Sequence, residues 1–277
     1  MEHFAPFLSS VTNQEKIGLQ KSKKVSEVVR MEEVRYQMLR PAQIIARRKD
    51  CPVAYVPLGN VEWHGIHNPL GLDTLKAEGI AVACARKGGG LVFPPLYYGE
   101  CRLEALRDNY PEVIDAMELP AENFEPDKTT FSATEQILNY QKLLLHILDE
   151  VQSLGFEVGV LVPGHGPLLA HAQAAVLVHN CRAKKKMLAW AFYDDCLVQD
   201  KYPDLGDHGG GWETSFLMAL HPETVDLDLL PPEPEKVVGA EGPIPPQNAS
   251  AEFGREILEA VVEKAVAEVR HRLENPR

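Results

Sequence analysis

The sequence lacks an apolar run long enough to cross a membrane, and its first residues form no continuous apolar core of the kind found in secretory signals. It is also poor in positive charge: 28 Lys and Arg stand against 40 Asp and Glu, a net charge of −12. The two basic clusters, Lys21–Lys24 and Lys184–Lys186, are short and lie beside acidic segments. We therefore expect a cytoplasmic protein with no membrane partner and no nucleic-acid partner.

Paired cysteine motifs are absent as well. The cysteines are five, an odd number, and none forms a Cys-x-x-Cys pair. Since a disulfide framework is typical of an even number of cysteines and a zinc ribbon needs Cys-x-x-Cys pairs, these residues fit reduced thiols in a cytoplasm. They are Cys51, Cys84, Cys101, Cys181 and Cys196.

Short apolar runs alternate with amphipathic stretches along most of the chain. The runs at 51–58, 156–162 and 188–193 predict strands that end at glycine, proline or aspartate. Helices are predicted at 73–86, at 214–220 and at 248–273, and a Ser132-x-x-Glu135 capping box predicts the start of another. This alternation favours an α/β fold in which helices cover both faces of a parallel sheet.

The length of 277 residues, with 45% hydrophobic and 25% charged residues, fits one α/β domain, which we expect to span 39–277. Residues 1–38 are polar and mixed, and we expect a leader that is either an oligomer arm or a loose tail. The segment 107–128 is rich in Pro, Glu and Asp without a clear period, which indicates a long loop or an interface arm.

A Glu62-Trp63-His64 triplet follows the first predicted strand. Such a triplet is weak by itself, because Glu and His are common neighbours on protein surfaces. Here it comes directly after Pro57–Asn60, where the apolar run ends. Because sites in open α/β sheets lie at the carboxyl ends of parallel strands, this position favours a functional role.

Two further histidines lie in glycine-rich segments downstream. His165 stands between two glycines after the second predicted strand, where the lack of side-chain bulk lets an imidazole approach an ion. A tight turn that merely contains a histidine is the alternative. The segment Asp207–Glu213 contains His208 and three glycines, and it leads into the predicted helix at 214–220.

Five of these side chains match the ligands that two metal ions need. Neutral imidazoles and carboxylates suit Zn²⁺ or Mn²⁺, and two neighbouring ions need a bridging carboxylate, for which Asp73 is the candidate. Two such ions generate hydroxide near neutral pH and polarise a carbonyl oxygen, so we expect hydrolysis. His208 is left as the catalytic proton shuttle, because the histidine pKa lies near neutrality. The predicted ligands are Glu62, His64, Asp73, His165 and Glu213.

Taken together, the segments resemble the successive signature blocks of the creatininase (creatinine amidohydrolase) family. The resemblance implies a three-layer sandwich with a mostly parallel central sheet, two zinc or manganese ions, hydrolysis of small cyclic amides or related rings, and a homo-oligomer, often a hexamer. It assigns Glu62, Asp73 and His165 to one ion. It assigns His64 and Asp73 to the other. The blocks, within a span from Leu39 to Ala267, are Pro57–Gly65, Leu72-Asp73, Tyr98-Gly99, Gly164–Gly166 and His208–Ser215.

Two departures from the family pattern bear on the reaction. Pro167 stands where the name-giving enzyme has a metal-binding carboxylate, so we expect Glu213 to supply the missing ligand. Should Glu213 not do so, Glu100 or Glu104 becomes the candidate. Trp63 stands where Gln is usual, which resembles relatives that hydrolyse a cyclic polyol ketone, such as a diketo-inositol, at a C–C bond.

Other interpretations of the sequence stay open. Trp63 and Trp212 are expected either to line the substrate pocket or to serve in packing. An isomerase of sugar ketones could use the same ions to polarise a carbonyl. A metal-binding regulator without activity is a third possibility, because Pro167 removes one family ligand.

Overall fold

The protein is described by a computed structural model that covers residues 33–99, 111–182, 186–233 and 235–276. Within this part, four parallel strands form one sheet in the order β2-β1-β3-β4. The central pair is aligned along its whole length, from Val53 beside Val158 to Leu58 beside Pro163. The strands are β1 (Val53–Leu58), β2 (Leu91–Val92), β3 (Val158–Pro163) and β4 (Leu188–Ala191).

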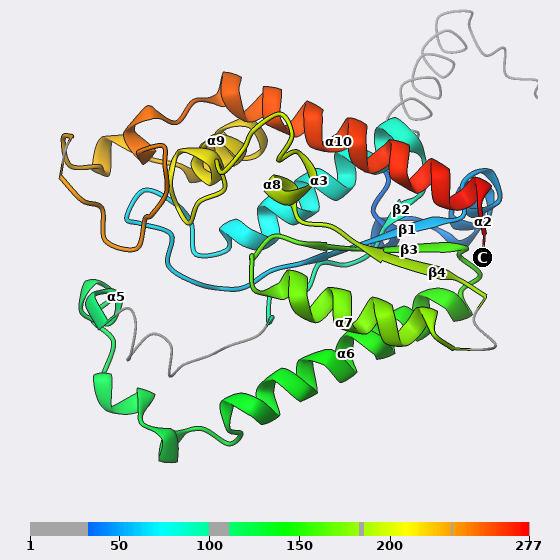
Figure 1. Ribbon diagram of the computed structural model, residues 1–277, viewed down its shortest axis with the longest axis horizontal. Helices are drawn as coiled ribbons and strands as arrows, with labels where there is room; N and C mark the ends of the chain where they lie inside the picture. The colour runs from blue at the N-terminus through cyan, green and yellow to red at the C-terminus, as the bar shows by residue number, and fades with distance from the viewer. Residues whose placement is uncertain (1–32, 100–110, 183–185, 234, 277) are drawn as a thin grey trace, which may run out of the picture.

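Helices cover both faces of the sheet (Figure 1). One face packs against α3 (Leu72–Gly88), α9 (Gly211–Leu220) and α10 (Ala251–Glu274), and the other against α6 (Ala133–Ser153) and α7 (Leu168–Asn180). Successive side chains of β1 alternate between the two hydrophobic clusters, with Tyr55 on the α3 face and Val56 on the α6 face. This arrangement confirms the three-layer α/β fold, and it explains why the strand is apolar throughout.

The remaining elements are short or lie at the edges of the layers. The α-helices are α2 (Pro41–Asp50), α5 (Pro111–Ala116) and α8 (Asp194–Leu197). The 3₁₀ turns are η1 (Tyr36–Met38), η2 (Ala121–Phe124), η3 (Pro126–Lys128), η4 (Pro222–Thr224), η5 (Leu227–Leu229) and η6 (Pro246–Asn248). No helix in the described ranges is both long enough and apolar enough to span a membrane.

The helix boundaries follow local capping chemistry. As predicted, Ser132 begins α6 with a capping box: its hydroxyl accepts from the Glu135 amide, and the Glu135 carboxylate accepts from the Ser132 amide. The predicted start of α9 at position 214 is wrong, because the Asp207 carboxylate accepts from the amides of Trp212 and Glu213 and so begins the helix at Gly211.

Two segments differ from the sequence expectation. The segment expected to be a loop between 107 and 128 contains α5, η2 and η3, while 107–110 lie outside the described residues. At the N-terminal side, Val34 is buried in the core and its carbonyl accepts from the Val92 amide. The packed domain therefore begins upstream of residue 39, and positions 1–32 of the expected leader are not among the described residues.

Candidate metal centre

The candidate site lies where the loops after β1 and β3 meet at the carboxyl edge of the sheet. Because Leu58 pairs with Pro163, the segments that follow these two residues leave the sheet side by side. Glu62 and His64 lie on the first segment, and His165 lies on the second. The first turn of α3 brings Asp73 between them, and the backbone approaches so closely there that a Cβ at Gly164 would overlap the Asp73 carbonyl oxygen.

Asp73 is central to the group. Its side chain is 1% exposed, with Oδ1 at 3.1 Å from His64 Nε2 and Oδ2 at 3.4 Å from His165 Nδ1. Neither oxygen has a hydrogen-bond partner among the described residues. Although burial acts to raise it, the two imidazoles hold the pKa of Asp73 well below its usual range. Each oxygen of one buried carboxylate thus faces a different imidazole, which is the arrangement expected of a ligand shared by two ions.

Glu62 lies close to the same histidines. Its Oε1 lies 2.9 Å from His165 Nδ1, 3.4 Å from His64 Nε2 and 3.6 Å from His208 Nδ1. This oxygen is also buried without a hydrogen-bond partner, as is His64 Nε2. Buried polar atoms normally have a hydrogen-bond partner, so a cluster of buried oxygen and nitrogen atoms without one fits the ligands of a metal ion.

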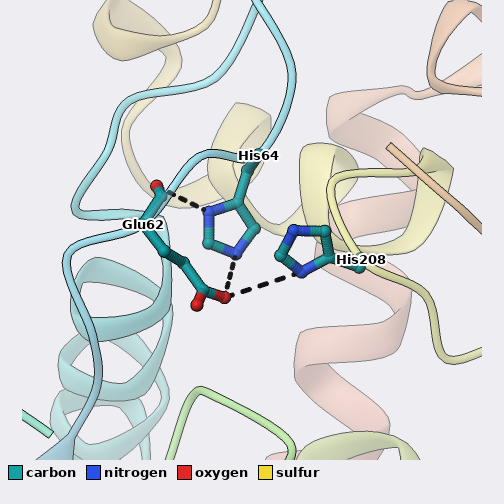
Figure 2. Close-up of side chains that lie close together, drawn as sticks. All are labelled: Glu62, His64 and His208. Carbon is teal, nitrogen blue, oxygen red and sulfur yellow. Dashed lines mark hydrogen bonds and ion pairs between the residues drawn. The ribbon is translucent and has the colours of Figure 1, made fainter. Parts of the chain in front are cut away.

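Backbone carbonyls fix which nitrogen of two histidines is available (Figure 2). Since a carbonyl only accepts, His64 Nδ1 must donate to the Glu62 carbonyl at 3.2 Å, which leaves the Nε2 lone pair facing the carboxylates. By the same argument, His208 Nε2 donates to the Trp63 carbonyl at 2.9 Å, and its Nδ1 points toward Glu62 Oε1. Both rings therefore present an unprotonated nitrogen to the centre when they are neutral.

Carboxylates determine the charge of the histidines in the metal-free protein. Burial alone would lower the pKa of His64, but Asp73, Glu213 and Glu62 outweigh it and raise that pKa to about 9. Burial alone would also lower the pKa of His165, but Asp73 and Glu62 outweigh it and raise that pKa to about 10. A divalent ion must displace these protons when it binds.

Glu213 differs from the other carboxylates because both of its oxygens already accept hydrogen bonds. Oε1 accepts from Lys76 Nζ at 2.7 Å, and Oε2 accepts from the Gly209 amide at 2.9 Å. Oε2 also lies 3.7 Å from His64 Nε2. A carboxylate oxygen that accepts one bond keeps a further lone pair, so Oε2 can still serve as a ligand.

The structure brings all five sequence-predicted ligands and His208 into one group. Their ligand atoms form three overlapping sets, within each of which all atoms lie within 4.8 Å of one another. Asp73, Glu62 and His64 each belong to two of the three sets. The sets are Glu62, Asp73 and His165; His64, Asp73 and Glu213; and Glu62, His64 and His208.

Comparison with known proteins places this geometry in a family. The family model described as "Creatininase: Creatinine amidohydrolase" matches residues 37–269. The chain belongs to the creatininase family. It is a hydrolase of that family, and its sheet and helices form an α/β fold, as the resemblance of the signature blocks predicted.

Two curated relatives of this creatininase-family chain have different names. A creatinine amidohydrolase of Pseudomonas putida is 27% identical over 207 residues, which cover 67% of this chain and 70% of the relative. A 3-dehydro-scyllo-inosose hydrolase of Thermotoga maritima is 26% identical over 196 residues, which cover 69% of this chain and 54% of the relative. The chain thus spans about half of the second relative.

Solved creatininase structures have the same fold. One described as the Mn form is 23% identical, with a TM-score of 0.60, and the match covers 88% of this chain and all of the other. A mutant of the Zn-Zn type is 24% identical at the same TM-score, over 88% of this chain and 99% of the other. At this identity the likeness shows the fold alone.

The two tryptophans of the signature blocks have different surroundings in this family member. Trp212 is 1% exposed, packs edge-on against Phe216 and Phe253, and donates from its indole to Asp194. This burial favours packing over pocket lining, the two roles that the sequence left open for Trp212. Trp63 is half-buried, and its indole donates to the Val238 carbonyl at 2.8 Å.

Pro167, the two fallback carboxylates and one lysine are not members of the ligand sets. Pro167 is exposed directly before α7, and its side chain has no atom that can bind a metal ion. Glu100 and Glu104, the fallback candidates, lie outside the described residues. Sequence reasoning missed Lys76, which contacts Glu213. A signal was present, because Lys76 lies on the same face of a largely apolar helix as Asp73 and Ile80.

Proposed function

We propose that this chain hydrolyses a small cyclic substrate with two divalent ions, Zn²⁺ or Mn²⁺. The observation that carries the proposal is Asp73, a buried carboxylate whose two oxygens each face a different histidine. Glu62, Asp73 and His165 would hold the first ion. The second ion would be held by His64, Asp73 and Glu213.

The reaction needs an activated water and a proton carrier. When bound, such a pair of ions supplies hydroxide near neutral pH and polarises the substrate carbonyl. His208 is the group that moves the proton. Its side chain is 40% exposed and its Nδ1 lies 3.6 Å from Glu62 Oε1, so it is placed to pass a proton to the leaving atom.

The substrate class is a ring that contains a carbonyl group. One curated relative is named for the amide ring of creatinine, and the other for a cyclic polyol ketone, 3-dehydro-scyllo-inosose. The two identities, 27% and 26%, do not separate these candidates. Trp63 favours the polyol ketone, because the family usually has Gln there. A homo-oligomer and a cytoplasmic location remain predictions from the sequence.

Metal content and oxygen incorporation test the proposal. We expect elemental analysis of gently purified protein to give about two ions per subunit, because five ligands with one bridge exceed the needs of one ion. The protein is then assayed on lactams, lactones and cyclic diketones in ¹⁸O-labelled water. A stoichiometry that stays at one or below after reconstitution with Zn²⁺ or Mn²⁺ contradicts the two-ion centre.

The oxygen label separates hydrolysis from the alternatives. Hydrolysis must place one water oxygen in the product, whereas an isomerase leaves the carbon skeleton intact and forms no acid or amine by adding water. Turnover without any increase in product mass by water addition would favour the isomerase. Bound metal without turnover of any ring would favour the regulator.

A further inference from the structure

A lysine lies buried beneath the candidate centre. Lys76 is on α3, one turn after Asp73, and its side chain is 0% exposed. Its Nζ lies 2.7 Å from Glu213 Oε1 and 3.4 Å from Asp194 Oδ1. The ammonium also lies 4.9 Å from the centre of the Tyr193 ring. A lysine is almost never fully buried unless it is paired, and here two buried carboxylates pair with it.

The contact determines how Glu213 is presented to the centre. With Oε1 held by Lys76 and Oε2 held by the Gly209 amide, the carboxylate plane cannot turn without breaking a buried hydrogen bond. Only Oε2 faces His64 Nε2. Oε1 is instead directed to the Lys76 ammonium, at 2.7 Å.

The same contact places the positive charge of Lys76 beside the ligand set that contains Glu213. Glu213 belongs to the set with His64 and Asp73, whereas the set of Glu62, Asp73 and His165 does not contain it. A buried cation repels a divalent ion more strongly than an exposed one, because the surroundings screen it less. The ion held by the Glu213 set therefore has only one oxygen of Glu213 as a ligand, and it is repelled by the positive charge of Lys76.

We propose that Lys76 is a positioning residue that restricts Glu213 to one ligating oxygen and so makes the ion held by His64, Asp73 and Glu213 the weaker and more readily exchanged of the two. The inference rests on the proposed two-ion function and concerns the ligand that takes over from position 167. It gives a role to the lysine that is buried on the same face of α3 as Asp73 and Ile80.

The test compares Lys76→Met with the wild-type full-length protein. Methionine has a similar length and no charge, so it frees Glu213 Oε1 while filling the same space. The two dissociation constants for Zn²⁺ are measured by competition with a chelator. In Lys76→Met we expect the more weakly held ion to bind more tightly, with a dissociation constant lower by roughly tenfold to a hundredfold. The dissociation constant of the more tightly held ion should stay within about threefold of the wild-type value.

Cobalt provides a readout of the ligand geometry. Co²⁺ replaces the weaker ion in both proteins, and its visible absorption is recorded because the intensity depends on the coordination number. A second oxygen from Glu213 in Lys76→Met should lower the intensity and shift the band. Lys76→Met in a Glu213→Gln background is the matched control. There the part of the affinity change that comes from a second Glu213 oxygen should vanish, and only the part that comes from removing the Lys76 charge should remain.

The outcomes separate this inference from the proposed function. A wild-type protein that never binds a second ion overturns the two-ion function and this inference with it. Two ions in the wild type, with the same ratio of constants and the same cobalt spectrum in Lys76→Met, overturn only the inference. If Lys76→Met alone does not fold, Lys76→Met combined with Asp194→Asn removes one charge of each sign, and the same measurements apply to it.

Discussion

His64 should make the metal-free protein lose stability as the pH rises above neutrality. Its side chain is 0% exposed, and nearby carboxylates raise its pKa from 6.5 to about 9 in spite of burial. A folded-state pKa above the unfolded value means that the stabilisation is fully present below pH 6.5 and is lost as the pH rises through 9. At ~1.4 kcal/mol per pH unit, the effect is about 3 kcal/mol.

Other groups titrate in or near this window, so a variant is needed as a reference. The pKa of His165 is raised to about 10, and burial and Glu213 raise the pKa of Asp207 to about 8. Both give the same sign as His64, because their folded-state values also lie above the unfolded ones. Burial lowers the pKa of His67 to about 4. His67 therefore changes the stability only between about pH 4 and pH 6.5, below the range in which His64 titrates.

The assay is urea unfolding of chelator-treated protein at pH 6.5, 8 and 9.5. The wild type should lose about 3 kcal/mol more than His64→Gln between the first and last pH values. Saturating Zn²⁺ should reverse the trend, because the ions compete with the same protons and bind better at high pH. Equal slopes for the two metal-free proteins, or a wild type that gains stability with pH, would refute the electrostatic reasoning.

Three substitutions test the roles of single side chains. Asp73→Asn should reduce the content of both ions in elemental analysis, since Asp73 belongs to both ligand sets; loss of only one ion would contradict the bridge. His208→Asn should keep both ions and lower turnover on the true substrate by roughly 10²- to 10⁴-fold, with a changed pH profile near neutrality; loss of an ion would make His208 a ligand instead. Trp212→Phe should lower the free energy of unfolding by about 1–3 kcal/mol, because Asp194 Oδ2 loses its buried donor. The metal content of Trp212→Phe should stay unchanged, and a stability equal to wild type would show that the indole bond contributes little.

The layers of the fold could be predicted because each strand is apolar on both faces. The β1 side chains divide between two clusters, so no polar residue interrupts the run, and the glycines and prolines that follow mark its end. The convergence of Glu62 and His165 also follows from the sequence, since parallel neighbouring strands carry their loops to the same edge.

Features set by contacts between distant segments could not be predicted. The burial of Trp212 depends on Phe253 of α10 and on Asp194 after β4, neither of which is close to it in the sequence. The same holds for Lys76, whose partners follow it by more than a hundred residues. The early start of α9 was missed because Asp207 caps the helix from outside the glycine run.

Gly164 limits how this centre can change in evolution. A side chain at position 164 would have to occupy the space of the Asp73 carbonyl, so it would push α3 and its ligand away from β3. Pro167 stands only a few residues later, exposed before α7, where different side chains can be accommodated without moving the backbone. In this chain, side chains around the centre can therefore be exchanged more easily than Gly164, on which the close approach to α3 depends.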